Sequence, residues 1–353
     1  MTGHKEIFET LRREILSGKF DAEKKLPSEN TLAHRFGVSR PTISRVTLDL
    51  KREGLIITRK GAPSTITKFA LNATGTLALV VPGESYAEIF RPLEMRLKKL
   101  AERAGWDLIH ERIKSTDPLV RAREVRRLAY RLSREHVTGV ILQPIEFIKD
   151  APKANEETVR YFDEAGITVV LLDYDFVSFP GRSRYDVVGI DNFAAGFTIA
   201  DHLLKTGSGR IAYLHRPCAA PTVTDRMRGV ASAVIEAGLP WSLAENVLKA
   251  EPANLRAVSK FIKTFKPDTF IAGNDIAAVK LGETLRKIGN GAENIALAGF
   301  DDVEAAEKAG ITTMRQPLDD IALVAIQTMI SRIREPGMPI RTTLLPASLV
   351  IRR

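Results

Sequence analysis

The stretch FGVSRPTISRVTLDLKREGLI, residues 36–56, predicts a helix with one apolar face and one basic face. Proline is tolerated only in the first turn of a helix, where its missing N–H has no intrahelical partner. Pro41 therefore marks the start of the helix, and Ser39 is the natural N-cap. The apolar residues recur at helical spacing: Ile43, Val46, Leu50 and Leu55. The remaining positions form a polar face: Arg40, Thr42, Ser44, Arg45, Lys51 and Arg52.

Positive charge is concentrated around this helix. The chain has 353 residues and a formal net charge of +9, and residues 1–70 hold 14 Lys and Arg against 8 Asp and Glu. Such a concentration in a small part of the chain is the electrostatic pattern of a nucleic-acid binder. A merely solvated basic surface would give the same count, so the charge alone leaves both interpretations open.

The bulk composition predicts a multidomain protein of a reducing compartment. A chain of 353 residues exceeds one ordinary hydrophobic core, so two or three domains are expected. Cys218 is the single cysteine, which excludes an intramolecular disulfide. The first 16 residues lack the apolar core of a signal peptide, and no apolar run approaches 18 residues. We therefore expect a cytoplasmic protein that does not cross a membrane.

Two further helices precede the basic one. Residues 5–20, KEIFETLRREILSGKF, place apolar side chains on one helical face. A second helix is expected after Pro27, with Ser28 as its N-cap, and residues 37–39 form a short glycine-containing turn into the basic helix. Two short helices joined by such a turn are the helix-turn-helix arrangement, in which the second helix enters the major groove of DNA.

A short hairpin is expected directly after the basic helix. Residues 55–69, LIITRKGAPSTITKF, predict two short strands around Gly61, with Arg59 and Lys60 at the basic tip. A hairpin in this place is the wing of a winged-helix domain.

Residues 26–66, LPSENTLAHRFGVSRPTISRVTLDLKREGLIITRKGAPSTI, resemble the winged-helix domain of GntR-type bacterial transcription regulators, and the likeness covers about residues 4–67. Arginine suits bidentate contact with guanine, and Ser, Thr and Lys reach phosphates. Many members of this family carry a basic residue where this chain has Asn30, so one DNA contact is expected to differ there. The resemblance implies seven DNA-binding residues: Ser39, Arg40, Thr42, Ser44, Arg45, Lys60 and Gly61.

The chain beyond a connector predicts an α/β fold with two lobes. We divide it into residues 1–70, a linker at 62–75 that overlaps the end of the wing, and residues 76–353. Short apolar strands alternate there with amphipathic helices, which is typical of parallel sheets covered on both faces. The strands are too many for one ordinary sheet, so two lobes with a cleft between them are expected. The predicted strands are 76–82, 107–113, 139–145, 168–175, 187–192, 210–216, 269–275 and 295–301, and the predicted helices include 86–104, 120–135, 193–205, 225–237 and 276–288.

Polar residues gather at the carboxyl ends of these strands, where parallel sheets bind their ligands. They are residues 82–85, Gln143, Asp173, 274–275 and 301–302. Each could be no more than a helix cap. Together they indicate a site for a hydroxyl-rich ligand, because Asp and Asn accept hydrogen bonds from neighbouring hydroxyls and Arg donates in a fork.

Residues 76–353 are similar to the effector-binding core of LacI/GalR-type repressors, which is related to periplasmic sugar-binding proteins. The likeness is carried by VVGIDNFAAGFTIADHLLKTGSGRIAYL at 187–214, TVTDRMRGVASAVIEAG at 222–238, FIAGNDIAAVKLGETLRKIG at 270–289, IALAGFDD at 295–302 and ITTMRQPLDDIALVAIQTMI at 311–330. The resemblance implies effector contacts at Asp173, Arg226, Asn274, Asp301 and Gln316, and more loosely at Gly83, Glu84 and Gln143.

The front end departs from that second family. The LacI-type DNA-binding head and its hinge helix are replaced by the GntR-type wing and linker, a combination that resembles the arabinose repressor and its chimeric relatives. Signalling by melting of a hinge helix is therefore not expected.

Other motifs point to no enzyme, cofactor or metal. The string GSGRIA at 207–212 follows a predicted helix and opens a strand, the reverse of a dinucleotide fingerprint. The six histidines show no metal-ligand spacing. His215 and Cys218 could form a nucleophilic pair, although a surface imidazole and a packed thiol fit the sequence better. Asp301 and Asp302 would point oppositely on an extended segment, so only one is expected in the cleft.

Four aromatic residues are candidates for stacking on a sugar ring, with core packing as the alternative for each: Tyr86, Phe90, Tyr174 and Phe176.

The sequence thus predicts a homodimeric, ligand-responsive DNA-binding regulator, a repressor that binds a pseudo-palindromic operator and a small polar effector such as a sugar. Derepression and co-repression have the same sequence signature. Two alternatives stay open: a sugar-binding protein of a transporter, and an α/β enzyme that uses the cleft.

Overall fold

The computed structural model describes residues 4–16, 19–20, 25–52, 55–58, 63–66, 75–82, 89–111, 113, 115 and 117–352. The wing-tip candidates Lys60 and Gly61 lie outside the described residues, as do the effector candidates Gly83 and Glu84 and the aromatic candidate Tyr86. Most of the predicted linker lies outside them as well.

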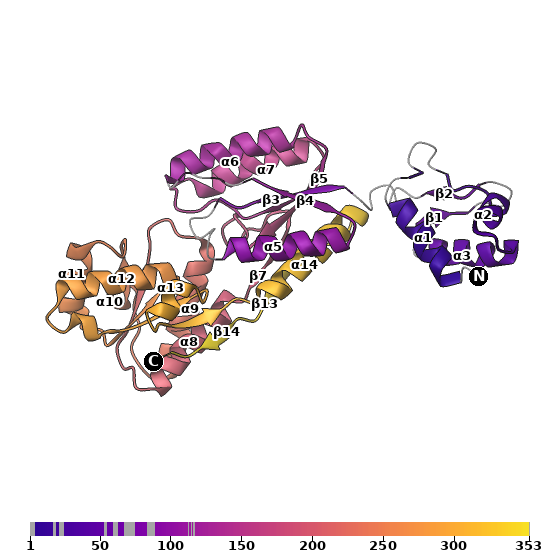
Figure 1. Ribbon diagram of the computed structural model, residues 1–353. Helices are drawn as coiled ribbons and strands as arrows, with labels where there is room; N and C mark the ends of the chain where they lie inside the picture. The colour runs from indigo at the N-terminus through magenta and orange to yellow at the C-terminus, as the bar shows by residue number, and fades with distance from the viewer. Residues whose placement is uncertain are drawn as a thin grey trace.

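The N-terminal domain is a winged helix with its own hydrophobic core (Figure 1). Its elements are α1 (His4–Leu16), α2 (Glu29–Phe36), α3 (Arg40–Arg52), β1 (Ile56–Ile57) and β2 (Thr65–Ile66). The two strands pair antiparallel, with Ile56 opposite Ile66. The structure thus has the three helices and the hairpin that the sequence predicts.

The turn between α2 and α3 follows the sequence signals. Ser28 caps α2, because its hydroxyl accepts a hydrogen bond from the backbone N–H of Thr31 at 3.2 Å. Gly37 ends α2 with φ of 65°, a conformation that glycine adopts at little cost. On α3, Ile43 and Val46 are fully buried, so the apolar face packs inward and leaves the basic face outside.

The first lobe of the large domain is built on a six-stranded sheet in the order β13-β7-β6-β5-β3-β4, in which every pair is parallel. Its strands are β3 (Thr76–Val80), β4 (Asp107–His110), β5 (Val137–Leu142), β6 (Thr168–Leu172), β7 (Asp186–Ile190) and β13 (Thr342–Leu345). The helices assigned to this lobe are α5 (Phe90–Arg103), α6 (Pro118–Leu132), α7 (Ala151–Glu164) and α14 (Leu318–Arg334).

The second lobe is built on a six-stranded sheet in the order β14-β12-β11-β10-β8-β9, in which only β14 runs antiparallel to its neighbour. Its strands are β8 (Ile211–His215), β9 (Val247–Lys249), β10 (Thr269–Ala272), β11 (Ala296–Phe300), β12 (Thr312–Arg315) and β14 (Ser348–Val350). Its helices are α8 (Asn192–Lys205), α9 (Pro221–Glu236), α10 (Leu243–Asn246), α11 (Leu255–Phe265), α12 (Asp275–Ile288) and α13 (Glu304–Lys308).

The chain crosses between the lobes three times. It leaves the first lobe between β7 and α8, returns between β12 and α14, and crosses again between β13 and β14. Helix α14 packs on α5 and on the first sheet, although it follows a strand of the second. The three crossings follow the strands β7, β12 and β13. The carboxyl ends of strands from both sheets therefore lie at the junction of the lobes and face a shared cleft.

The predicted two-lobed α/β architecture is therefore confirmed, with differences in its elements. Helix α9 begins at Pro221 rather than at residue 225. Helix α5 spans Phe90–Arg103 after a turn at Ile89, and residues 86–88 of the predicted helix lie outside the described residues. The sequence pattern also missed β9, β12, β13 and β14, which are short strands at or near sheet edges.

No helix among the described residues is both long enough and apolar enough to span a bilayer.

Candidate functional site

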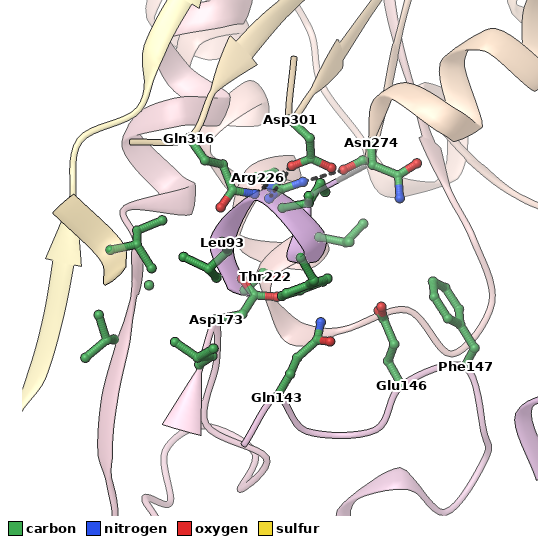
Figure 2. A pocket seen from close by; sticks show the side chains of 18 residues that line it. Leu93, Gln143, Glu146, Phe147, Asp173, Thr222, Arg226, Asn274, Asp301 and Gln316 are labelled. Atoms are coloured by element: carbon green, nitrogen blue, oxygen red, sulfur yellow. Dashed lines mark hydrogen bonds and ion pairs between the residues drawn. The ribbon is translucent and has the colours of Figure 1, made fainter. Parts of the chain in front are cut away.

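A cavity between the two lobes brings together all the predicted effector residues that the structure describes (Figure 2). Gln143 and Asp173 come from the first lobe, at the ends of β5 and β6. The second lobe supplies the others, from α9 and from the ends of β10, β11 and β12: Arg226, Asn274, Asp301 and Gln316. Strands that are far apart in the sequence thus end next to one another, and the polar residues that follow them line the same cavity.

Arg226 is the central cation of this cavity and is 4% exposed. Its Nε donates to Asn192 Oδ1 at 2.7 Å, and its Nη1 donates to the Gly273 carbonyl at 2.7 Å. Its Nη2 lies 3.6 Å from Asp301 Oδ1, and the guanidinium lies 4.7 Å from the Phe300 ring centroid. A buried charge needs such compensation. Asn192 is the first residue of α8, where the chain crosses from the first lobe to the second. Arg226 therefore links the cavity to this crossing.

Asp301 enters the cavity, and its neighbour Asp302 does not. The amide of Gln316 donates to Asp301 Oδ1 at 2.7 Å. Asp302 instead forms ion pairs with Arg315 and with Arg352 near the end of the chain. The prediction that only one of the two carboxylates faces the cleft is confirmed. The extended backbone on which that prediction was based is wrong, because both residues have positive φ, 109° and 58°.

Asp173 is held in an unusual backbone conformation by a glycine in the next strand. Its φ is 73°, and its backbone N–H donates to the Val188 carbonyl at 2.9 Å. A Cβ at Gly189 would lie 2.5 Å from the Asp173 carbonyl oxygen, so the approach of the two backbones requires glycine there. The pKa of Asp173 is raised to about 6, mainly because burial desolvates the carboxylate; the charge of Arg226 opposes this rise and the charge of Asp301 adds to it.

The cavity contains acceptors and donors that the protein leaves for a ligand. The buried Gln143 Oε1 has no hydrogen-bond partner among the described residues. Burial and neighbouring charges, with no hydrogen bond, account for the raised pKa of the Asp173 carboxylate. Asn274 caps α12 through its Oδ1, which accepts from the Ala277 N–H at 2.8 Å, while its amide nitrogen makes no hydrogen bond within the described residues. A capping role and a ligand-facing role therefore coexist in Asn274.

Close packing of α8 on α9 fixes the position of Arg226. A Cβ at Gly229 would lie 2.0 Å from the Phe193 carbonyl oxygen, and one at Gly196 would lie 2.0 Å from the Arg226 carbonyl oxygen. The two helix backbones thus touch at both glycines, and the backbone of Arg226 is part of the contact.

Sequence reasoning missed several residues of the cavity wall. Glu146 and Phe147 lie a few residues past the strand end at which Gln143 was identified, and Thr222 lies in the motif that supplied Arg226. Following each strand end for four residues would have found the first two. Apart from Phe90, the apolar wall could not be read from the sequence, because its residues look like ordinary core: Ile89, Leu93, Leu172, Val188, Val223 and Ile321.

The aromatic candidates that the structure describes lie in two different environments. Phe90 lines the cavity, whereas Tyr174 and Phe176 belong to the hydrophobic cluster of the first lobe. The Tyr174 hydroxyl donates to the Pro144 carbonyl at 3.1 Å, which anchors it in that cluster.

The DNA-binding candidates lie on the outer face of α3. Ser39, Arg40, Ser44 and Arg45 are exposed, and Thr42 is half-buried with its hydroxyl 2.9 Å from that of Ser39. Arg40 Nε lies 3.3 Å from Glu29 Oε2, and no described residue pairs with the side chain of Arg45. The helix therefore presents at least one uncommitted guanidinium to a partner.

The described residues form neither a metal site nor a paired His215 and Cys218. The described residues contain no group of three or more His, Cys, Asp or Glu that could hold a metal ion. His215 contacts the Arg216 carbonyl at 2.8 Å and the Thr224 hydroxyl at 3.2 Å, and burial lowers its pKa. Cys218 is exposed and is not paired with that ring. The expectation of a packed thiol and a surface imidazole is therefore wrong on both counts, because the thiol is at the surface and His215 is 7% exposed.

Comparisons with known proteins agree with this architecture. Residues 4–66 match the model described as bacterial regulatory proteins, gntR family, and residues 200–353 match the model described as periplasmic binding protein-like domain. The chain is 25% identical over 339 residues to the arabinose metabolism transcriptional repressor of Geobacillus stearothermophilus, covering 91% of this chain and 88% of that protein. It is 24% identical over 326 residues to the ribose operon repressor of Escherichia coli strain K12, covering 87% and 93%.

Among solved structures, a complex of the transcriptional regulator CelR with cellobiose matches with a TM-score of 0.65 at 21% identity, covering 93% of this chain and 99% of that chain. At that identity the likeness establishes the fold.

The winged helix, the two-lobed core and these matches define a class: the chain is a ligand-responsive, DNA-binding transcriptional regulator. More particularly, it joins a domain that matches the gntR family model, residues 4–66, to one that matches the periplasmic binding protein-like model, residues 200–353.

Proposed function

We propose that the protein is a homodimeric repressor that acts in the cytoplasm, has no catalytic activity, and responds to a neutral sugar or sugar derivative. The observation that supports the proposal is the convergence of Asp173, Arg226, Asn274, Asp301 and Gln316 from two lobes on one cavity. A molecule with several hydroxyl groups would satisfy the open acceptors and donors of both lobes at once. The proteins it resembles include repressors of arabinose and ribose metabolism.

The charges of the cavity favour a neutral ligand. Among the described lining residues, Glu146, Asp173 and Asp301 are acidic and Arg226 is the cation. The guanidinium already lies beside the Asp301 carboxylate, which offsets its charge, so the cavity holds no unpaired positive charge for an anionic group among the described lining residues. A phosphate or carboxylate would meet net negative charge in a poorly solvated site.

The effector would act by changing the relative position of the lobes. It contacts both of them, so it stabilises the arrangement in which both sets of contacts are made. It can shift operator affinity only by its differential affinity for the two conformations, typically about 1–3 kcal/mol. In the proposed mechanism this rearranges the two subunits and so changes the spacing of the two winged helices on DNA.

A thermal-shift screen tests the proposal. L-Arabinose, D-ribose and cellobiose are compared with their phosphorylated counterparts, using the full chain. At least one neutral sugar is expected to raise the melting temperature, because bound ligand stabilises the fold by mass action, and the phosphorylated counterpart is not. The same sugar should then release the protein from operator DNA in a gel-shift titration. Stabilisation by the phosphorylated sugars alone would contradict the proposal.

Removing the uncommitted guanidinium of the recognition helix should weaken DNA binding. Arg45→Ala is expected to cost about 1–3 kcal/mol of operator affinity while effector binding stays unchanged, because Arg45 lies on α3, outside the effector domain. Arg160→Ala is the matched control, since Arg160 is an exposed arginine that pairs with Glu164 in the first lobe. Equal operator affinity in the two variants, measured by fluorescence anisotropy, would count against α3 as the recognition helix.

Effector affinity should depend on pH through Asp173. Its pKa is about 6 in the ligand-free cavity, and donation from hydroxyl groups would favour the ionised form and lower that pKa. The ionised protein therefore binds more tightly, so affinity should rise from pH 5 to pH 7 and then level off. Calorimetry at several pH values measures this, with Asp173→Asn as the variant in which the rise is lost. An unchanged pH profile in that variant would assign the titration to another group.

A further inference from the structure

Two loops at the rim of the cavity tie the lobes together without any ligand. One follows β5 in the first lobe and carries Glu146 and Phe147, and the other follows β8 in the second lobe and carries Cys218 and Ala220. The Phe147 N–H donates to the Cys218 carbonyl at 2.8 Å, and the Ala220 N–H donates to Glu146 Oε2 at 3.2 Å. The Ala220 side chain is 4% exposed and packs in the hydrophobic cluster of the first lobe, although its chain belongs to the second.

A cation–π contact lies over these hydrogen bonds. The guanidinium of Arg216, from the second lobe, lies 4.3 Å from the ring centroid of Phe147, from the first. Arg216 is also held on its own side, since its Nε lies 2.9 Å from Glu251 Oε2 at the end of β9. The second lobe therefore presents a guanidinium fixed in place, and the first lobe presents the ring that it covers.

The backbone at this contact adopts a conformation that needs support. Phe147 and Cys218 have φ of 63° and 56°, which is uncommon for residues other than glycine. These are the two residues joined by the hydrogen bond across the lobes. We call the set Glu146, Phe147, Arg216, Cys218 and Ala220 the clasp.

The clasp lies at the rim of the effector cavity. Glu146 and Phe147 line the cavity on the side opposite to Asp173 and Gln316, as Figure 2 shows, and Thr222 and Val223 line it just beyond Ala220. A molecule that enters between the lobes at this rim has to separate the two loops first.

We propose that the clasp is a gate for the effector cavity, in which Arg216 is a positioning residue that acts through Phe147. The closed gate holds the lobes together in the ligand-free protein and is present again in the complex. Opening it is required for both entry and exit, so it controls the rates of effector exchange more than the affinity. The part of the inference that concerns the effector rests on the proposed function, whereas the contact between the lobes does not.

Hydrogen–deuterium exchange of the ligand-free full chain tests the contact itself. Arg216→Ala should speed exchange in the peptide around Phe147, on the other lobe, by two- to fivefold, which corresponds to loss of one cation–π contact. Phe147→Leu removes the aromatic ring from the first-lobe side of the same contact. This variant should speed exchange in the peptide around Ala220, on the second lobe. The control is Arg228→Ala, which removes an arginine from α9 that pairs with Asp225 at 2.8 Å outside the clasp. Exchange that stays confined to the mutated lobe in both clasp variants would overturn the proposal.

Stopped-flow binding tests the gate, with whichever of L-arabinose, D-ribose or cellobiose stabilises the protein. Arg216→Ala should raise the association and dissociation rates together, each by two- to fivefold, and leave Kd nearly unchanged, because Arg216 is not among the described residues that line the cavity. A faster dissociation with unchanged association would show that Phe147 is an ordinary ligand contact and would refute the gate. If none of the three sugars binds, the proposed effector class fails, and the exchange experiment still decides whether the clasp exists.

Discussion

Replacement of Arg226 by alanine is expected to abolish the effector response and to destabilise the large domain by about 3–5 kcal/mol. The guanidinium is 4% exposed and serves three acceptors, Asn192 Oδ1, the Gly273 carbonyl and Asp301. Its removal leaves a carboxylate that is 6% exposed without its cation, and breaking a buried pair in this way has an effect of that size. Urea unfolding measures the loss of stability, and a gel-shift titration with effector measures the loss of the response.

Two comparisons separate the roles of Arg226. Arg228→Ala, two residues along α9, removes an exposed arginine that pairs with Asp225, so it should change stability by less than about 1 kcal/mol. Arg226→Lys keeps the charge but not the planar fork that reaches three acceptors, so it should fold better than the alanine variant and still lose the response. A normal response in Arg226→Lys would show that the site needs the charge alone.

The second large effect is expected at Gly229, where one added methyl group should destabilise the second lobe by about 3 kcal/mol. A Cβ there would lie 2.0 Å from the Phe193 carbonyl oxygen and 2.7 Å from the Phe197 backbone nitrogen. Backbone atoms of α8 cannot rotate away as a side chain can, so the helices must separate and lose close packing. Since Arg226 is one turn before Gly229 on α9, the effector response should weaken as well.

Gly282→Ala is the matched control for this variant. Gly282 is also in a helix, but a Cβ there would meet Leu297 Cδ1 at 3.0 Å, and that side chain can move. Because alanine favours the helix by up to about 1 kcal/mol over glycine, this variant should be neutral or slightly more stable. The fluorescence of Trp241, which packs against the second lobe's core, follows both variants during unfolding. Similar midpoints for the two would contradict the close helix contact.

The parts of the fold that could be predicted are those determined by residues close together in the sequence, such as helix starts and helical spacing. Pro41 and Ser28 mark helix starts, and the spacing of Ile43, Val46 and Leu50 gave the buried face of α3 correctly. The strand ends that supplied Asp173 and Asn274 follow from the rule that parallel sheets bind ligands at their carboxyl edge.

Other parts depend on contacts between residues far apart in the chain. Strands β12 and β13 are short and half-polar, and their pairing is fixed by tertiary neighbours rather than by their own pattern. The positive φ of Asp301 and Asp302 has no reliable local signal, because aspartate adopts it more often than most residues but still in only a small fraction of cases. Arg216 and Phe147 are 69 residues apart, so nothing in either stretch indicates that they meet.

The ion pair between Asp302 and Arg352 has a consequence for the terminus of the polypeptide. Strands β13 and β14 contribute an edge to each sheet within the last dozen residues, and Arg352 then anchors the segment that carries Asp301. Loss of Arg352 by truncation would therefore disturb ligand sensing, although this residue lies far from the cavity in sequence. A premature stop codon close to position 350 should be as damaging as a substitution inside the pocket.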